Sequence, residues 1–204
     1  MNDEGNAERV TQESRGKLRQ FIRVLISYID FQQAGGIASY ILDHNLHDRY
    51  PRDRFLLQGL NTGMIVAYCR PFSGNERGAV TNVPNLPERF LRVLTKDERR
   101  LHAVVKNDRN SVLAHSDSTA WELKPQVLRL HGHETLWPAH HDVHAPLMRD
   151  ATVQFRVMCY KLGEACFDER LRLEPELKPY LEVIEPDYEE LKRIAEQLGV
   201  NLPR

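Results

Sequence analysis

Apolar residues recur at steps of three and four along most of this chain, and this spacing limits its fold more than any other feature. Such a period places apolar side chains on one face of an α-helix. The first stripe of this kind consists of Leu18, Phe21, Ile22, Leu25, Ile26 and Ile29. Gly35 and Gly36 weaken this helix, so it either continues past them or a second segment begins there and ends at Pro51.

The same spacing predicts further helices over residues 52–70, 87–94, 95–116, 145–172 and 186–198. The third of these starts with Thr95 and Glu98, which form a capping-box signature. Its apolar stripe consists of Leu101, Val105 and Val112. We expect this stripe to pack the helix into the centre of the protein.

The stretch 117–145 lacks the helical period, and we expect it to be an irregular insertion. Within it, Val127, Leu128 and Leu130 are candidates for a short strand of a small hairpin. Packing against the helices is the expected role of Trp121 and Trp137, although an aromatic ring can also stack on a nucleic-acid base.

These patterns predict an all-α protein, built as a four-helix bundle with the irregular insertion at about 117–145 and a C-terminal helix. Residues 71–87 are rich in Gly, Asn, Pro and Ser and are typical of a loop. We expect residues 1–175 to form the bundle, including the insertion, and residues 176–204 to form a helical appendix.

Charge and cysteine content exclude several classes of protein. The 204 residues include 28 basic and 29 acidic side chains, which excludes a strongly basic protein that coats nucleic acid. No run approaches the roughly 18 apolar residues of a membrane span, and the first twelve residues show no signal-peptide pattern. Cys69, Cys159 and Cys166 are too few for a disulfide framework, so we expect reduced, buried thiols in a cytoplasmic protein.

The most informative polar residues lie near the end of the helix predicted at 95–116. On a helical wheel, Arg109 and His115 flank the apolar stripe, one on each side. Asp108, Asn110 and Ser111 lie beside them in sequence. Geometry alone favours a plain interpretation, in which these groups cap the helix or form salt bridges at the edge of its buried face.

An Arg followed by a polar residue, a spacer and a His on a late helix resembles the signature of the HEPN superfamily. Here the signature reads Arg109-Asn110, four residues, and His115. The run Ala67-Tyr-Cys-Arg-Pro-Phe-Ser73 looks like the abortive-infection branch of that superfamily. The resemblance covers roughly residues 15–170. It implies a four-helix bundle that is often a homodimer, with the motif helices of two subunits facing a shared cleft.

The resemblance implies a metal-independent endoribonuclease, active as a toxin or in phage defence. In that chemistry the RNA 2′-hydroxyl attacks the adjacent phosphate, and His115 acts as general base or acid. Arg109 then stabilises the charge on the phosphate, and Asn110 orients the phosphate or the imidazole. Asp108 or Ser111 sets the tautomer of the histidine. No cofactor and no metal are expected.

Three readings remain open at this stage. For the nuclease, Arg70 and Lys106 are candidate RNA-binding residues, and the expected partners are a second copy, RNA and an antitoxin or other protein. The alternative is a non-catalytic module of the same fold that recognises RNA, a nucleotide or a protein. A third reading is a metal-binding helical protein, for which an exposed loop with incidental histidines is the plainer interpretation; its histidines are His131, His133, His140, His141 and His144.

Overall fold

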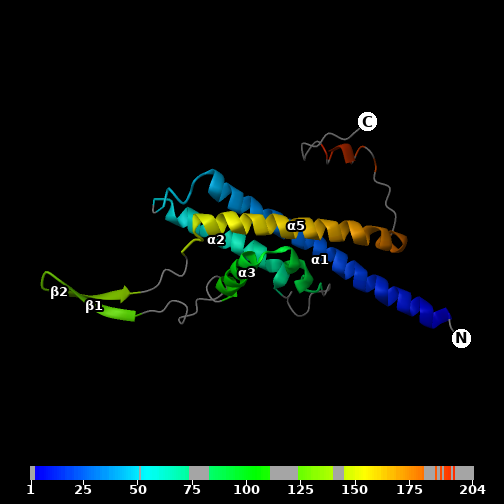
Figure 1. Ribbon diagram of the computed structural model, residues 1–204, viewed down its shortest axis with the longest axis horizontal. Helices are drawn as coiled ribbons and strands as arrows, with labels where there is room; N and C mark the ends of the chain where they lie inside the picture. Colours follow the sequence, from blue (N-terminus) through cyan, green and yellow to red (C-terminus); the bar gives the residue numbers. More distant parts are fainter. Residues whose placement is uncertain are drawn as a thin grey trace.

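The computed structural model describes residues 3–50, 52–73, 83–110, 124–139 and 145–181, together with a few positions between 187 and 195. The described chain is mostly helical and contains one small two-stranded sheet, which is compatible with the predicted all-α class (Figure 1). In chain order the elements are α1 (Asp3–Asp43), α2 (Arg54–Cys69), the 3-10 helices η1 (Arg70–Phe72) and η2 (Glu88–Val93), α3 (Lys96–Asp108), β1 (Lys124–Leu130), β2 (His133–Ala139), α5 (Arg149–Leu177) and the 3-10 helix η4 (Lys178–Tyr180).

Helices α1 and α5 are the two longest elements, and they pack against each other along much of their length (Figure 1). A Cβ atom added at Gly35 would lie 3.2 Å from Cβ of Cys159 on α5, so glycine allows the two backbones to approach closely. Gly35 and Gly36 therefore lie inside one continuous helix of 41 residues and do not divide it. The packing gained at Gly35 offsets the low helix propensity of glycine.

Helices α2 and α3 lie on one side of the α1–α5 pair (Figure 1). Three aromatic side chains, one from each of α1, α2 and α5, meet in the core. The Tyr68 ring centroid is 5.7 Å from that of Phe31 and 5.0 Å from that of Phe155. All three side chains are almost fully buried, so this cluster fixes the relative positions of the three helices.

The ends of two helices differ from the expected ones. The stretch predicted as a short helix at 87–94 is the 3-10 helix η2. Helix α5 was expected to stop at Arg172, but it continues through Pro175 to Leu177. Leu173 and Leu177 are both buried, and their packing holds the last turns although proline removes one backbone donor.

A β-hairpin occupies the middle of the stretch that was expected to be irregular. β1 and β2 pair antiparallel, with Leu130 opposite His133. The two turn residues, His131 and Gly132, have φ angles of 49° and 82°, the left-handed values of a type I′ hairpin turn. The hairpin points away from the helices, and the Trp137 side chain is 55% exposed (Figure 1). The expectation that Trp137 packs the insertion onto the helices is therefore wrong.

The start of α3 confirms the predicted capping box. Thr95 Oγ1 accepts a hydrogen bond from the Glu98 backbone N–H, and the Glu98 carboxylate accepts one from the Thr95 backbone N–H at 2.7 Å. The Lys161 ammonium of α5 donates to both carboxylate oxygens of Glu98, at 2.7 and 2.9 Å. Glu98 is buried, so one carboxylate both caps α3 and binds it to α5.

Replacing Lys161 by methionine is expected to lower the free energy of unfolding by about 1–3 kcal/mol, because the buried Glu98 carboxylate loses its charged partner. Burial acts to raise the pKa of Glu98, but hydrogen bonds from Lys161 and Thr95 outweigh it and lower the pKa below 4.5. The stabilisation is therefore present above pH 4.5 and disappears as the pH falls through the lower pKa of the folded state.

Urea unfolding of the wild type and of Lys161→Met, followed by circular dichroism from neutral pH to below pH 4.5, measures the difference between their free energies of unfolding. The matched control is Arg100→Met, which removes an exposed Arg100–Asp97 pair from the same helix and should cost less than about 0.5 kcal/mol. The role assigned to Lys161 would be contradicted if Lys161→Met and Arg100→Met lost equal free energy of unfolding. It would also be contradicted if the difference between Lys161→Met and the wild type did not shrink in acid.

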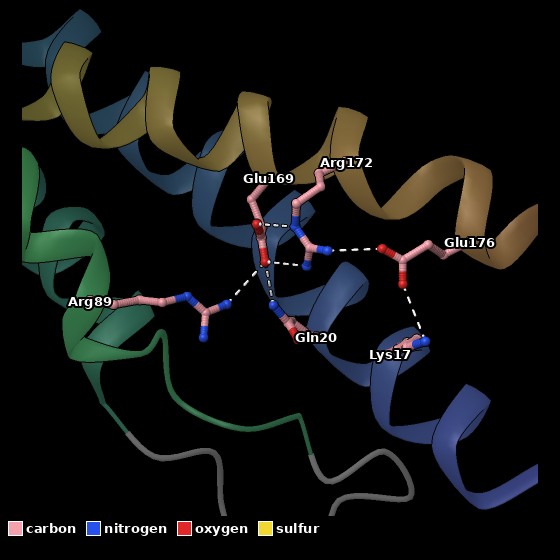
Figure 2. A network of polar contacts seen from close by, with 6 residues as sticks. All are labelled: Lys17, Gln20, Arg89, Glu169, Arg172 and Glu176. Atoms are coloured by element: carbon pink, nitrogen blue, oxygen red, sulfur yellow. Dashed lines mark hydrogen bonds and ion pairs between the residues drawn. The ribbon is translucent and has the colours of Figure 1, made fainter. Parts of the chain in front are cut away.

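A second charged network joins three elements near the C-terminal half of α5 (Figure 2). The Glu169 carboxylate accepts hydrogen bonds from Arg89 of η2 at 3.0 Å, from Arg172 at 2.9 Å and from Gln20 of α1. The network continues through Glu176 to Lys17 of α1. Because the carboxylate of Glu169 already occupies the centre, this cluster of cations ties elements together and is not an open anion site.

Two further features of the described chain bear on its class. Cys69, Cys159 and Cys166 are free and buried, as the sequence predicted. Burial raises the pKa of Cys166 to about 12 and raises that of Cys159 still further, so these are inert thiols. Within the described ranges, no helix combines the length and apolarity that crossing a bilayer requires.

Candidate functional site

The end of α2 and the second half of α3 meet in the fold, although about 35 residues separate them in the sequence. Tyr68 Oη lies 2.9 Å from His102 Nδ1, and both side chains are buried. One residue further along α2, the Cys69 thiol points to the backbone oxygen of Val105 at 3.9 Å. The first of the two sequence segments that carry the resemblance therefore lies against α3, at residues that precede the second segment.

The face of α3 that makes this contact is partly polar. Glu98, His102 and Val105 are its buried residues, whereas Leu101 is half-buried at the edge of the core. The predicted stripe is thus correct for Val105, partly correct for Leu101, and outside the described residues for Val112. Periodicity counted only apolar residues, and for that reason it missed the two buried polar side chains on the same face.

His102 supports the junction and does not present a reactive group. Burial lowers the pKa of His102, and the nearby charge of Lys106 acts in the same direction, so the imidazole is neutral. Its ring packs edge-on against Phe72 with centroids 4.8 Å apart. A neutral, hydrogen-bonded and stacked imidazole holds the end of α2 against α3.

Arg109, the first residue of the predicted motif, caps the C-terminal end of α3. Its side chain is half-buried, and its guanidinium Nη1 donates to Asn110 Oδ1 at 3.0 Å. Burial raises the pKa of the Cys69 thiol to about 12, while the positive charges of Arg109 and Lys106 act to lower it.

Of the remaining residues of the motif, the structure describes Asp108 and Asn110 but not Ser111 and His115. Asp108 is half-buried, and burial raises the pKa of its carboxyl group. Arg109 and Asn110 continue α3 in a π-helical conformation, a local geometry that is frequent at functional sites. Ser111 and His115 lie outside the described residues, so their predicted roles remain predictions.

Arg70 follows Cys69 directly and is anchored to α1. Its Nη1 atom donates to Asp30 Oδ1 at 3.2 Å and to Gln33 Oε1 at 3.0 Å. Asp30 is buried; burial raises its pKa, and the hydrogen bond and charge of Arg70 reduce that rise. The Arg70 side chain is 53% exposed, so one nitrogen is held while the rest of the guanidinium reaches the surface. Lys106, the other candidate RNA-binding residue, is exposed on α3.

The histidine-rich segment is only partly described. His131 lies in the hairpin turn and His133 begins β2, and both side chains are exposed. His140, His141 and His144 lie outside the described residues. In the part of the chain that the structure describes, no group of three or more His, Cys, Asp or Glu side chains could hold a metal ion.

Comparison of the chain with models of protein families, with curated proteins and with solved structures finds no match.

Proposed function

We propose that this chain is a metal-independent endoribonuclease of HEPN type, acting as a toxin or in phage defence. The observation that carries the proposal is the contact of Tyr68 and Cys69, at the end of α2, with His102 and Val105 of α3, the helix that leads into the motif. The resemblance rests on two separate runs, residues 67–73 and 109–115, and a chance match gives no reason for them to belong to two helices that touch. The positive charge of Arg109, in the second run, acts to lower the pKa of the Cys69 thiol, in the first.

In this proposal α1, α2, α3 and α5 are the four helices of the bundle, and the site lies at the exposed end of α3. Arg109 is suited to bind phosphate because its guanidinium is half-exposed and oriented by Asn110. Arg70 is suited to the same task because Asp30 and Gln33 hold one of its nitrogens.

The proposed reaction is an internal phosphoryl transfer. The 2′-oxygen forms a bond to phosphorus while the bond from phosphorus to the 5′-oxygen breaks, leaving a 2′,3′-cyclic phosphate and a 5′-hydroxyl. His115 takes the proton of the 2′-hydroxyl or gives one to the leaving 5′-oxygen. Arg109 stabilises the negative charge that develops on the phosphate oxygens.

Incubation of the full-length chain with mixed RNA, with and without EDTA, tests the proposal. We expect cleavage that survives the chelator. Cleavage that is lost with EDTA and unaffected by His115→Ala would move the site to the histidine-rich segment. Binding of RNA without cleavage would favour the non-catalytic module of the same fold.

A further inference from the structure

An open groove, here called the α1–α5 groove, runs between α1 and α5, and α2 and α3 lie on the other side of this helix pair (Figure 1). Its volume is about 740 Å³, within the range of sites that hold small molecules. Two residues of its lining, Gly36 of α1 and Gly163 of α5, have no side chain and leave this space. A Cβ atom added at Gly36 would meet nothing within 4 Å, so the groove is open there.

Aromatic rings from both helices line the α1–α5 groove. Tyr160 Oη of α5 lies 3.5 Å from Ser39 Oγ of α1, so this side chain spans the two helices. Two turns further along α5, the Phe167 ring meets the Tyr28 ring of α1 with centroids 6.0 Å apart. Gln32 Nε2 donates a hydrogen bond to Tyr28 Oη at 2.8 Å and orients that ring. Contacts between the two walls therefore hold three aromatic rings around the groove.

The charged residues in the groove lining are both acidic. Glu164 and Asp168 are exposed and lie four residues apart on α5, about 6 Å along its axis. Neither carboxylate makes a hydrogen bond or ion pair with a residue that the structure describes. On the same helix, Lys161 is bound to Glu98, and Arg156 lies about 12 Å before Glu164 along the axis. Like charges four residues apart destabilise a helix, so this pair favours a cation beside it.

Arg170 is a cation beside the groove, but it has its own partner. Its guanidinium lies 5.9 Å from the centroid of the Phe167 ring and donates a hydrogen bond to Glu174 at 2.6 Å. The ring thus already accepts one cation, whose charge Glu174 neutralises. α1 adds no cation, because its only charged residue between positions 25 and 40 is Asp30, which pairs with Arg70. The groove therefore keeps a net negative charge.

Asp168 also borders a second groove, which lies between α5 and η2. That groove is lined by three arginines, Arg89, Arg92 and Arg172. Two of them, Arg89 and Arg172, are hydrogen-bonded to Glu169. Glu164 lines the α1–α5 groove and not the second one, so its substitution tests the α1–α5 groove alone.

We propose that the α1–α5 groove binds an aliphatic polyamine, a chain of methylene groups that carries two or more ammonium groups. The rings of Tyr28, Tyr160 and Phe167 contact the methylene groups and attract the ammonium groups through their π faces. Glu164 and Asp168 accept hydrogen bonds from the ammonium groups, and the opposite charges strengthen these bonds. A compact metal ion would leave the aromatic walls unused, whereas a long organic cation uses both the walls and the carboxylates.

This inference does not depend on RNA cleavage. The lining of the α1–α5 groove comes from α1 and α5, and it includes none of the residues proposed for the nuclease. Binding of a polyamine is therefore measured in the absence of RNA, and its failure would leave the proposed chemistry untouched.

Isothermal titration calorimetry of the full chain with spermidine tests the inference. We expect one site per chain with a dissociation constant below about 1 mM. Glu164→Gln should raise the dissociation constant about tenfold, because it removes the charge from one hydrogen bond to the ligand. Asp150→Asn is the matched control, since it removes one exposed carboxylate from the same helix, about 21 Å from Glu164 along the axis. The control should change the dissociation constant less than about twofold, because salt screens a charge at that distance.

Two further variants test the walls of the groove. Gly36→Leu fills the open space and should raise the dissociation constant for spermidine at least about tenfold. It should stay folded, because a Cβ atom fits there and leucine favours a helix more than glycine does. Phe167→Leu keeps an apolar side chain but removes the ring, and it should raise the dissociation constant about two- to fivefold. Circular dichroism checks the fold of both variants.

Two control ligands separate the contributions of charge and of apolar contact. Hexanediol has the methylene chain without the charge, and Mg²⁺ has the charge without the chain, so each should bind more weakly than spermidine. The inference would be overturned if spermidine did not bind, or if either control ligand bound as tightly. It would also be overturned if Glu164→Gln and Asp150→Asn weakened binding equally, or if a folded Gly36→Leu protein bound spermidine as the wild type does.

Discussion

Replacing His115 by alanine is expected to lower the rate of RNA cleavage by about 10²- to 10⁴-fold, the usual contribution of a positioned general acid or base. On the helix that the sequence predicts over residues 95–116, His115 lies beside the apolar stripe and not within it, so we expect the variant to fold normally. Single-turnover cleavage measures the loss, and circular dichroism checks the fold. Wild-type rates in a folded His115→Ala protein would exclude His115 from the reaction.

Arg109→Ala is expected to cost about 10²- to 10³-fold in the same assay, if its guanidinium stabilises the phosphate as one oxyanion donor does. Arg99→Ala is the matched control, since Arg99 is exposed near the start of the same helix, about 15 Å along its axis from Arg109. We expect the control to cleave at nearly the wild-type rate. Equal losses of cleavage rate for Arg109→Ala and Arg99→Ala would indicate that cleavage depends on the overall positive charge of the chain and not on Arg109 in particular.

Phe155→Ala is expected to lower the free energy of unfolding by about 3–5 kcal/mol, because it leaves a cavity where α1, α2 and α5 meet. The Phe155 ring is fully buried and packs against Tyr68. Phe55→Ala on α2 is the control, because Phe55 is 85% exposed and its loss should cost less than about 0.5 kcal/mol. Urea denaturation gives both values, and similar losses for the two variants would contradict the assignment of this core.

The features that the sequence predicts well are those set by neighbouring residues. The capping box of Thr95 and Glu98 needs only residues three apart, and it is present as predicted. The strand at Val127 and Leu128 follows from local propensity and is confirmed as part of a hairpin. Helical periodicity likewise located α2 and α5 to within a few residues.

Long-range contacts explain what the sequence left open and what it predicted wrongly. Local sequence predicts that Gly35 weakens its helix, because it does not show the close approach of Gly35 to Cys159 of α5. Pro175 predicts a helix end, but the burial of Leu173 and Leu177 stabilises the helix on both sides of it. Trp137 reads as a core residue, but the hairpin that carries it points away from the helices. In each case tertiary packing determines the local structure, and the local sequence carries no information about that packing.

The candidate site shows the same division. The sequence proposed Arg70 and Arg109 from their residue types and motif, and the fold packs the end of α2, which precedes Arg70, against α3, which Arg109 caps. It did not identify Asp30 as the anchor of Arg70, because forty residues separate them. His102 was also missed, although its position three residues before Val105 on the same helix was a signal that could have found it.

The most direct test of the proposed chemistry compares two substrates cleaved by the wild-type chain in EDTA. One is an RNA oligonucleotide with a mapped cleavage site, and the other carries a 2′-deoxy nucleotide immediately 5′ of that site. If the 2′-hydroxyl is the nucleophile, the RNA is cut to a 2′,3′-cyclic phosphate and a 5′-hydroxyl, and the deoxy substrate stays intact at that bond. Equal cleavage of both substrates, or products with 5′-phosphate ends, would contradict the proposal.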